Sequence, residues 1–163
     1  MLCIQRYRRR RYGRFESSVS PRCSRNPTHG FVGQLRRIDR TAVDFKTPAD
    51  IKWVRNAAGT NESAVLFGDP AKPGPYVVRL KWLPGNMSRP HFHPNDRFFV
   101  VLSGTWWVGT GEKFDPDNTV PVPAGSYVVH YGGKVHFDGA KDEEAVIQVW
   151  GMGPASSTPA EKR

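Results

Sequence analysis

The stretch that decides the fold is Gly85-Asn-Met-Ser-Arg-Pro-His91-Phe-His93-Pro-Asn-Asp-Arg97-Phe-Phe-Val-Val-Leu-Ser-Gly104. Two histidines lie one residue apart in a segment that otherwise has the composition of a β-strand. On a strand, residues i and i+2 share a face, so the two rings are expected to converge on one side of a sheet. Their Cα atoms would lie about 6–7 Å apart, which lets both imidazoles reach one metal ion.

A third histidine follows in Pro123-Ala-Gly125-Ser-Tyr-Val-Val-His130-Tyr-Gly132-Gly133-Lys-Val-His136-Phe-Asp138. The pair of glycines predicts a tight turn that delivers His136 to the next strand. Three neutral imidazoles would then define one site for a divalent metal such as Zn, Cu, Fe or Ni. The alternative is that these histidines are polar strand residues that bind no metal.

Both stretches resemble the two sequence motifs of the cupin family. The first family motif is Gly, five residues, His-x-His, three or four residues, Glu, six residues, Gly, and its matches are Gly85, His91, His93 and Gly104. The second is Gly, five residues, Pro-x-Gly, two residues, His, three residues, Asn, matched at Gly125, Gly133 and His136, with Tyr131 and Ala140 as replacements. The resemblance covers about residues 60–155. It implies a double-stranded β-helix, a jelly-roll barrel, with the three histidines facing its interior.

Arg97 stands where the family's first motif has its metal-binding Glu. A guanidinium has no lone pair to offer a metal, so a metal held here would keep its positive charge beside a second cation. We therefore read Arg97 as a possible anchor for an acidic substrate, because its planar fork suits a carboxylate or phosphate. The competing interpretation is an ion pair with Asp96 or another surface acid.

Segments rich in β-branched and aromatic residues recur along the chain from residue 51. They cover residues 51–54, 63–67, 76–82, 97–102, 105–108, 126–130 and 145–150. Turn signals such as Pro84-Gly85, Ser103-Gly104 and Gly132-Gly133 separate them, and no long amphipathic helix pattern interrupts them. This spacing predicts an all-β sandwich or barrel, in agreement with the resemblance.

The barrel interior is expected to carry further pocket residues besides the motif positions. By strand alternation we expect Phe99 and Tyr127 to line the pocket, although aromatic side chains on strands belong more often to the core. His130 is the last strand residue before the Gly132-Gly133 turn. It could be a fourth metal ligand, an acid/base group or a surface histidine.

The excess of basic over acidic residues is confined to the first 40 residues of the chain. The formal net charge is +9, yet residues 1–40 hold 11 arginines and two acids, which leaves 13 basic and 13 acidic residues beyond them. We therefore expect a disordered Arg-rich tail over residues 1–40 and a neutral cupin domain over residues 41–163. Contact of the tail with nucleic acid or membrane is the least favoured function. No standard secretory signal is visible, which favours a soluble, cytoplasmic protein.

The resemblance also implies a chemistry. Cupins with a three-histidine centre are similar to thiol and diketone dioxygenases, so His91, His93 and His136 would hold Fe(II), with Zn, Mn, Ni or Cu as other candidates. Arg97 would orient a small anionic substrate, and His130 or Tyr127 would handle a proton. The alternative is a non-catalytic cupin module that binds or senses a small molecule. Exposed strand edges favour a homodimer.

Overall fold

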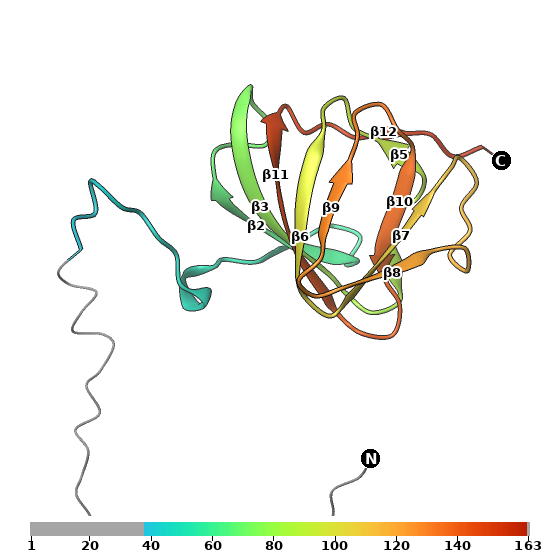
Figure 1. The fold of residues 1–163 in the computed structure, drawn as a ribbon, viewed down its shortest axis with the longest axis horizontal. Helices are drawn as coiled ribbons and strands as arrows, with labels where there is room; N and C mark the ends of the chain where they lie inside the picture. Colours follow the sequence, from blue (N-terminus) through green and yellow to red (C-terminus); the bar gives the residue numbers. More distant parts are fainter. Residues whose placement is uncertain (1–37, 163) are drawn as a thin grey trace, which may run out of the picture. The chain divides into compact units, whose positions relative to one another are not determined.

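The computed structural model describes residues 38–162. Most of the Arg-rich tail predicted over residues 1–40, including Cys3 and Cys23, lies outside these residues, and the prediction of disorder there stays a prediction. The chain divides into two compact units, Met1–Asp44 and Phe45–Arg163. The second unit contains a 3-10 helix, η1 (Pro48–Asp50), and two β-sheets (Figure 1).

The two sheets are antiparallel throughout and face each other, which is the predicted all-β jelly roll (Figure 1). The first sheet has the order β1 (Val54–Arg55), β2 (Asn61–Phe67), β3 (Gly74–Trp82), β11 (Ala145–Gly153), β6 (Arg97–Ser103) and β9 (Tyr127–His130). The second has the order β12 (Thr158–Pro159), β5 (His91–Phe92), β10 (His136–Ala140), β7 (Thr105–Thr110) and β8 (Val120–Pro123), and β4 (Asn86–Met87) pairs with β10.

The core fills the space between the sheets and follows the two-residue alternation of the strands. Phe99 and Val101 on β6 point inward, as do Ile147 and Val149 on β11, all with at most 3% of their surface exposed. Trp106 on β7 covers them from the second sheet and is completely buried. Burial of this apolar surface is the main stabilising contribution to the barrel.

Turn glycines connect the strands where the chain comes closest to itself. Gly104 joins β6 to β7 with a φ of 70°, and a Cβ there would collide with the carbonyl oxygen of Glu144. Only glycine meets both demands, because other residues rarely adopt a positive φ. The last residue of the first family motif is therefore explained by backbone geometry.

The long predicted strands are present within a few residues of their expected ends, and the short strands of the second sheet were not anticipated. Pro90 and Pro94 flank the motif histidines and have no backbone N–H, so β5 is limited to two residues and His93 lies just beyond it. Within residues 38–162 no helix is long and apolar enough to cross a membrane.

Candidate metal centre

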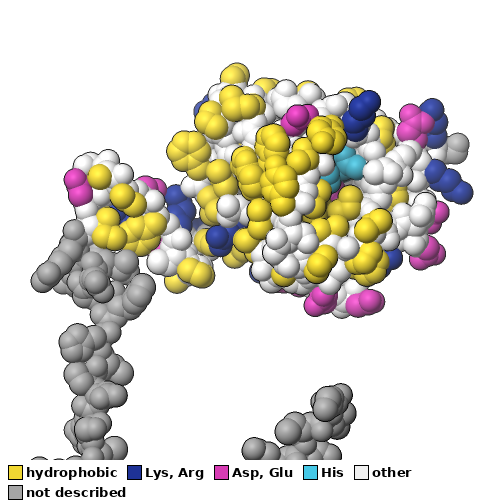
Figure 2. All heavy atoms as spheres, viewed as in Figure 1, with side chains coloured by type: hydrophobic (Ala, Val, Ile, Leu, Met, Phe, Trp, Pro, Cys, Tyr) yellow, Lys and Arg dark blue, Asp and Glu magenta, His cyan; other side chains and the backbone are white. Residues whose placement is uncertain are grey.

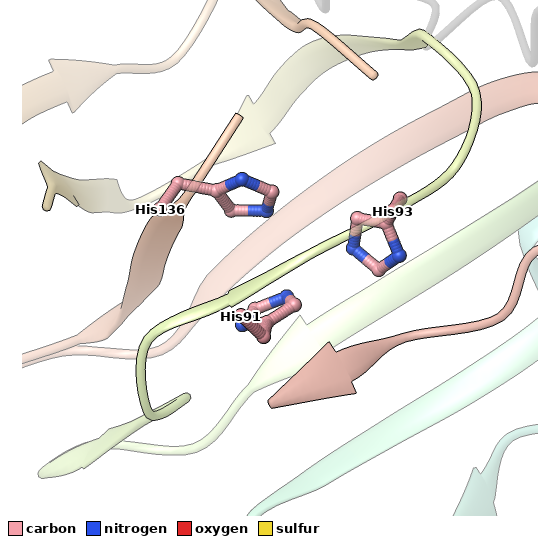
Figure 3. Close-up of side chains that lie close together, drawn as sticks. All are labelled: His91, His93 and His136. Carbon is pink, nitrogen blue, oxygen red and sulfur yellow. The ribbon is translucent and has the colours of Figure 1, made fainter. Parts of the chain in front are cut away.

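The three histidines of the family motifs converge at one end of the barrel. His91 on β5 is the cross-strand partner of His136 on β10, so both side chains project from the same face of the second sheet. The ring centroids lie 4.9 Å apart for His91 and His93, 4.6 Å for His91 and His136, and 5.3 Å for His93 and His136 (Figure 3). One ring nitrogen from each lies within 4.8 Å of the other two. We call His91, His93 and His136 the motif histidines.

Each motif histidine is oriented by a backbone carbonyl at its Nδ1 atom. Nδ1 of His91 lies 2.7 Å from the carbonyl oxygen of Arg89, and Nδ1 of His136 lies 3.0 Å from that of Lys134. Nδ1 of His93 lies 2.8 Å from the carbonyl oxygen of Ser156. A carbonyl only accepts, so each Nδ1 carries a proton, and the lone pair of each neutral ring lies on Nε2. Histidines that ligate metals through Nε2 commonly donate their other ring N–H to a backbone carbonyl in this way.

The environment favours the neutral form of His93 and His136. Burial and the adjacent charge of Arg97 lower the pKa of His93 to about 3. Burial also lowers the pKa of His136, and the carboxylate of Asp138 opposes this shift. Only the neutral form has a lone pair, so protons do not compete with a metal for these two rings near neutral pH.

Of the Nε2 atoms at this site, that of His136 has no partner within residues 38–162 and that of His93 is held only by Arg97. Nε2 of His136 is buried and makes no hydrogen bond. Nε2 of His93 accepts from Nη1 of Arg97 at 2.5 Å. A buried acceptor without a donor is costly, and a metal ion would satisfy all three lone pairs at once. The donor set therefore fits a divalent transition metal.

Arg97 points into the site. It is the cross-strand partner of His130 on β9, and alternation along β6 places it on the same face as the core residue Phe99. Its Nε atom is buried without a partner, and no carboxylate within residues 38–162 forms an ion pair with it. The neighbouring Asp96 instead accepts from the backbone N–H of Gly132 at 2.7 Å. The competing interpretation of a surface ion pair with Asp96 is therefore wrong.

His130 occupies a different environment, deeper among aromatic rings. Its ring centroid lies 4.6 Å from that of Phe99, 5.3 Å from Trp106 and 3.9 Å from His136. Neither of its nitrogens has a hydrogen-bond partner, and burial, followed by the charge of His136, lowers its pKa to about 2. His130 is 7% exposed, so it is not a surface histidine.

His130 and Asp138 form a second group with His136. One ligand atom from each of the three lies within 4.8 Å of the others, and all three residues are buried. Oδ1 of Asp138 accepts from Nε1 of Trp106 at 3.2 Å. His130 does not join the group of His91 and His93, so the geometry does not place it as a fourth ligand of an ion centred on the motif histidines. We call His130 and Asp138 the core pair.

Tyr127 does not line the pocket, contrary to the expectation from sequence. Its side chain is 60% exposed, and its ring neighbours Trp150 at 6.2 Å on the outer face of the first sheet. Tyr127 and His130 are three residues apart on one strand, so they face opposite sides of the sheet, and only His130 points inward. Phe99 lies inside the barrel against His130, as part of the hydrophobic core, and is not among the residues that line the small cavity at His130 and His136.

A small cavity of about 160 Å³ reaches His130 and His136. Its walls are mainly apolar, with Val108 and Val128 among them, and Tyr131 and Lys134 contribute polar groups. Histidine side chains are visible at the surface, with hydrophobic side chains along one side of them (Figure 2). The cavity can admit a small molecule next to the histidine cluster.

The turn before β10 is fastened to the loop after β5. The N–H of Gly133 donates to the carbonyl of His93 at 2.7 Å, beside the bond from Gly132 to Asp96. A Cβ on Gly132 would lie 2.7 Å from the carbonyl oxygen of Pro94, so only glycine permits this approach. These contacts fix the position of His136 relative to His93.

Sequence reasoning missed the carbonyls that orient the motif histidines, such as that of Ser156, and the carboxylate of Asp138. Ser156 acts through its backbone carbonyl, which any residue provides, so no side-chain pattern could reveal it. Asp138 could have been found, because it follows His136 at the i+2 spacing that places both on one face of a strand.

Comparisons with known proteins address the fold. No family model matches the sequence, and no curated protein sequence matches it significantly. Among solved structures, the polyketide cyclase RemF from Streptomyces resistomycificus is similar with a TM-score of 0.61 and 17% identity, covering 74% of this chain and 87% of that chain. KdgF from Halomonas sp. is similar with a TM-score of 0.52 and 16% identity, covering 74% of this chain and 96% of that one.

A third similar structure is a protein with a double-stranded β-helix domain from Klebsiella pneumoniae subsp. pneumoniae. Its TM-score is 0.52 and its identity 24%, and the match covers 67% of this chain and 91% of that chain. At these identities the likenesses show the fold alone.

Proposed function

We propose that this chain, which has the cupin fold, is a metal-dependent enzyme that acts on a small anionic molecule in the mouth of its barrel. The family resemblance of the two motifs and the structural likeness agree on the fold. The observation that carries the proposal is the set of three Nδ1–carbonyl hydrogen bonds, which leaves Nε2 as the ligating atom of three histidines whose ring nitrogens lie close together.

His91, His93 and His136 would hold the metal through their Nε2 atoms. We favour Fe(II) by analogy with three-histidine cupins, and such an ion would supply open positions for a substrate donor atom and for O2. The ligand set is neutral, so the centre retains its positive charge and favours an anionic substrate.

Arg97 supports an anionic substrate in particular. Its guanidinium has a buried Nε–H without an acceptor and no carboxylate partner within the described barrel. A substrate carboxylate could accept from this fork while another of its atoms faces the histidines. The 160 Å³ cavity reaches this cluster at His130 and His136, is lined in part by valine side chains, and would suit a small molecule.

His130 could accept a proton from such a substrate. It is neutral, borders the same cavity and has two nitrogens without partners. The role proposed for Tyr127 in proton transfer is withdrawn, because its hydroxyl belongs to the outer face of the first sheet.

The test is oxygen uptake by the Fe(II)-loaded protein, screened over small carboxylates, thiols and diketones. We expect uptake with one of these classes, loss of uptake in His91→Ala, and normal uptake in Tyr127→Phe, a matched control on the outer face. Uptake that survives His91→Ala unchanged would exclude the motif histidines from the reaction.

A non-catalytic cupin module that binds or senses a small molecule is the second candidate. Arg97 in place of the family's Glu favours it, because the ligand set has lost its anionic member. A protein that retains stoichiometric Zn and consumes no oxygen with any substrate class would support this candidate over the dioxygenase.

A further inference from the structure

Arg97 and a metal ion would compete for the same lone pair. Nη1 of Arg97 donates to Nε2 of His93 at 2.5 Å, while Nδ1 of His93 is already committed to the carbonyl of Ser156. An imidazole has one lone pair when neutral, so His93 cannot accept from Arg97 and ligate a metal through Nε2 at the same time. Metal uptake by all three motif histidines therefore requires Arg97 to move.

The guanidinium of Arg97 forms no ion pair within residues 38–162, and the nearby carboxylate of Asp138 already accepts from the indole N–H of Trp106. The adjacent Asp96 is used by the N–H of Gly132. After metal binding the site would hold a dication and a guanidinium side by side on a neutral ligand set, which is unfavourable in a half-buried position. An anion placed between them would relieve both charges.

We infer that Arg97 couples the two ligands of this site, so that a metal ion and a carboxylate are taken up together and each strengthens the binding of the other. The inference rests on the proposed metal site and assigns the co-ligand to the class of small carboxylates. Without a carboxylate, Arg97 stays hydrogen-bonded to Nε2 of His93 and thereby weakens metal binding. With one, the guanidinium pairs with the carboxylate and leaves Nε2 of His93 to the metal.

The coupling must be reciprocal, because binding free energies form a closed cycle. If the carboxylate tightens metal binding by a given factor, the metal tightens carboxylate binding by the same factor. Couplings between sites are commonly about 5–150-fold, and a shared lone pair places this one within that range.

The experiment titrates the full chain with Co(II), followed by its visible absorption, in the presence of acetate or of acetamide at equal concentration. Acetamide has nearly the same shape and carries no charge. We expect acetate to lower the dissociation constant for Co(II) about tenfold or more and acetamide to leave it unchanged. The Co(II) spectrum reports directly on the ligand set, independently of catalysis.

Three variants separate the role of Arg97 from general electrostatics. Arg97→Gln should bind Co(II) at least as tightly as the unmodified protein without acetate and should lose the acetate effect. Arg97→Glu should bind Co(II) most tightly and independently of acetate. Arg79→Gln removes the same charge from β3, where Nε of Arg79 donates to Gln148, and should keep the acetate effect intact.

The outcomes distinguish this inference from the proposed function. Co(II) binding that is insensitive to acetate, or an acetate effect that persists in Arg97→Gln, overturns the coupling and leaves the metal site standing. Absence of Co(II) binding by the unmodified protein and by Arg97→Gln under every condition overturns both.

Discussion

The motif histidines and the core pair lie around the same end of the barrel, and all of them except His91 are buried, yet their hydrogen bonding differs. Each motif histidine donates a hydrogen bond from Nδ1–H to a backbone carbonyl, which fixes the orientation of the ring and the direction of the lone pair on Nε2. His130 has no hydrogen bond and is held by packing against Phe99 and Trp106. The difference teaches that fixed lone pairs, rather than burial or proximity, distinguish residues prepared to ligate a metal.

Removal of His136 is expected to have the largest effect on Co(II) affinity and therefore tests the difference between the motif histidines and the core pair most strongly. His136→Ala deletes one proposed ligand of three, so we expect Co(II) affinity to fall by more than about 100-fold, beyond the roughly 10–100-fold cost of losing a group that only orients a ligand. His130→Leu is the matched control, and it should change Co(II) affinity less than about tenfold. Equal losses in the two variants would contradict the distinction between motif histidines and core pair.

A change at Trp106 should affect the core pair and spare the motif histidines. Trp106→Phe removes the indole N–H that bonds Asp138 and leaves a buried carboxylate oxygen without that donor. We expect the free energy of unfolding to fall by about 1–3 kcal/mol, measured by urea denaturation. Co(II) affinity should change little, and a loss comparable with that of His136→Ala would show that Asp138 acts as a ligand.

Acid should destabilise the metal-free barrel through its neutral histidines. Folding lowers the pKa of His93 to about 3 and that of His130 to about 2, from an ordinary value of 6.5. Below pH 6.5 the unfolded chain takes up protons that the folded chain refuses, so stability falls as the pH drops from 6.5 toward 3. The slope is at most about 1.4 kcal/mol per pH unit for each histidine.

The measurement is the urea midpoint of metal-free protein at pH 7.5, 6.0 and 5.0. His130→Leu should reduce the dependence on pH, because one of the titrating groups is removed. A midpoint that stays constant between pH 7.5 and 5.0 would show that these histidines are protonated as readily in the folded chain as in the unfolded one.

Strand periodicity and motif spacing predicted the parts of the fold and site that depend on side-chain type. They gave the long strands of both sheets, the convergence of His91, His93 and His136, and the inward position of Phe99. Strand alternation, correctly applied, also predicts that Tyr127 faces outward when His130 faces inward, because residues three apart on a strand lie on opposite faces. The error came from assigning both to the interior.

The remaining features depend on backbone atoms and on distant segments. The short extent of β5 follows from its flanking prolines. These prolines are visible in the sequence, but the strand-like composition around them was given more weight in the prediction. The contact between Gly132 and Pro94 and the partnership of Ser156 with His93 join segments whose meeting is decided by the whole barrel. No local pattern carries that information.

The three carbonyls that orient the motif histidines also impose an order on the site's assembly. They belong to Arg89 before β5, to Lys134 in the turn before β10, and to Ser156 after β11. During synthesis the ribosome releases Ser156 last, about 60 residues after the two histidines of the first motif. The nascent chain therefore contains His91 and His93 long before Ser156 can orient His93, so full affinity of the proposed metal site would require a closed barrel.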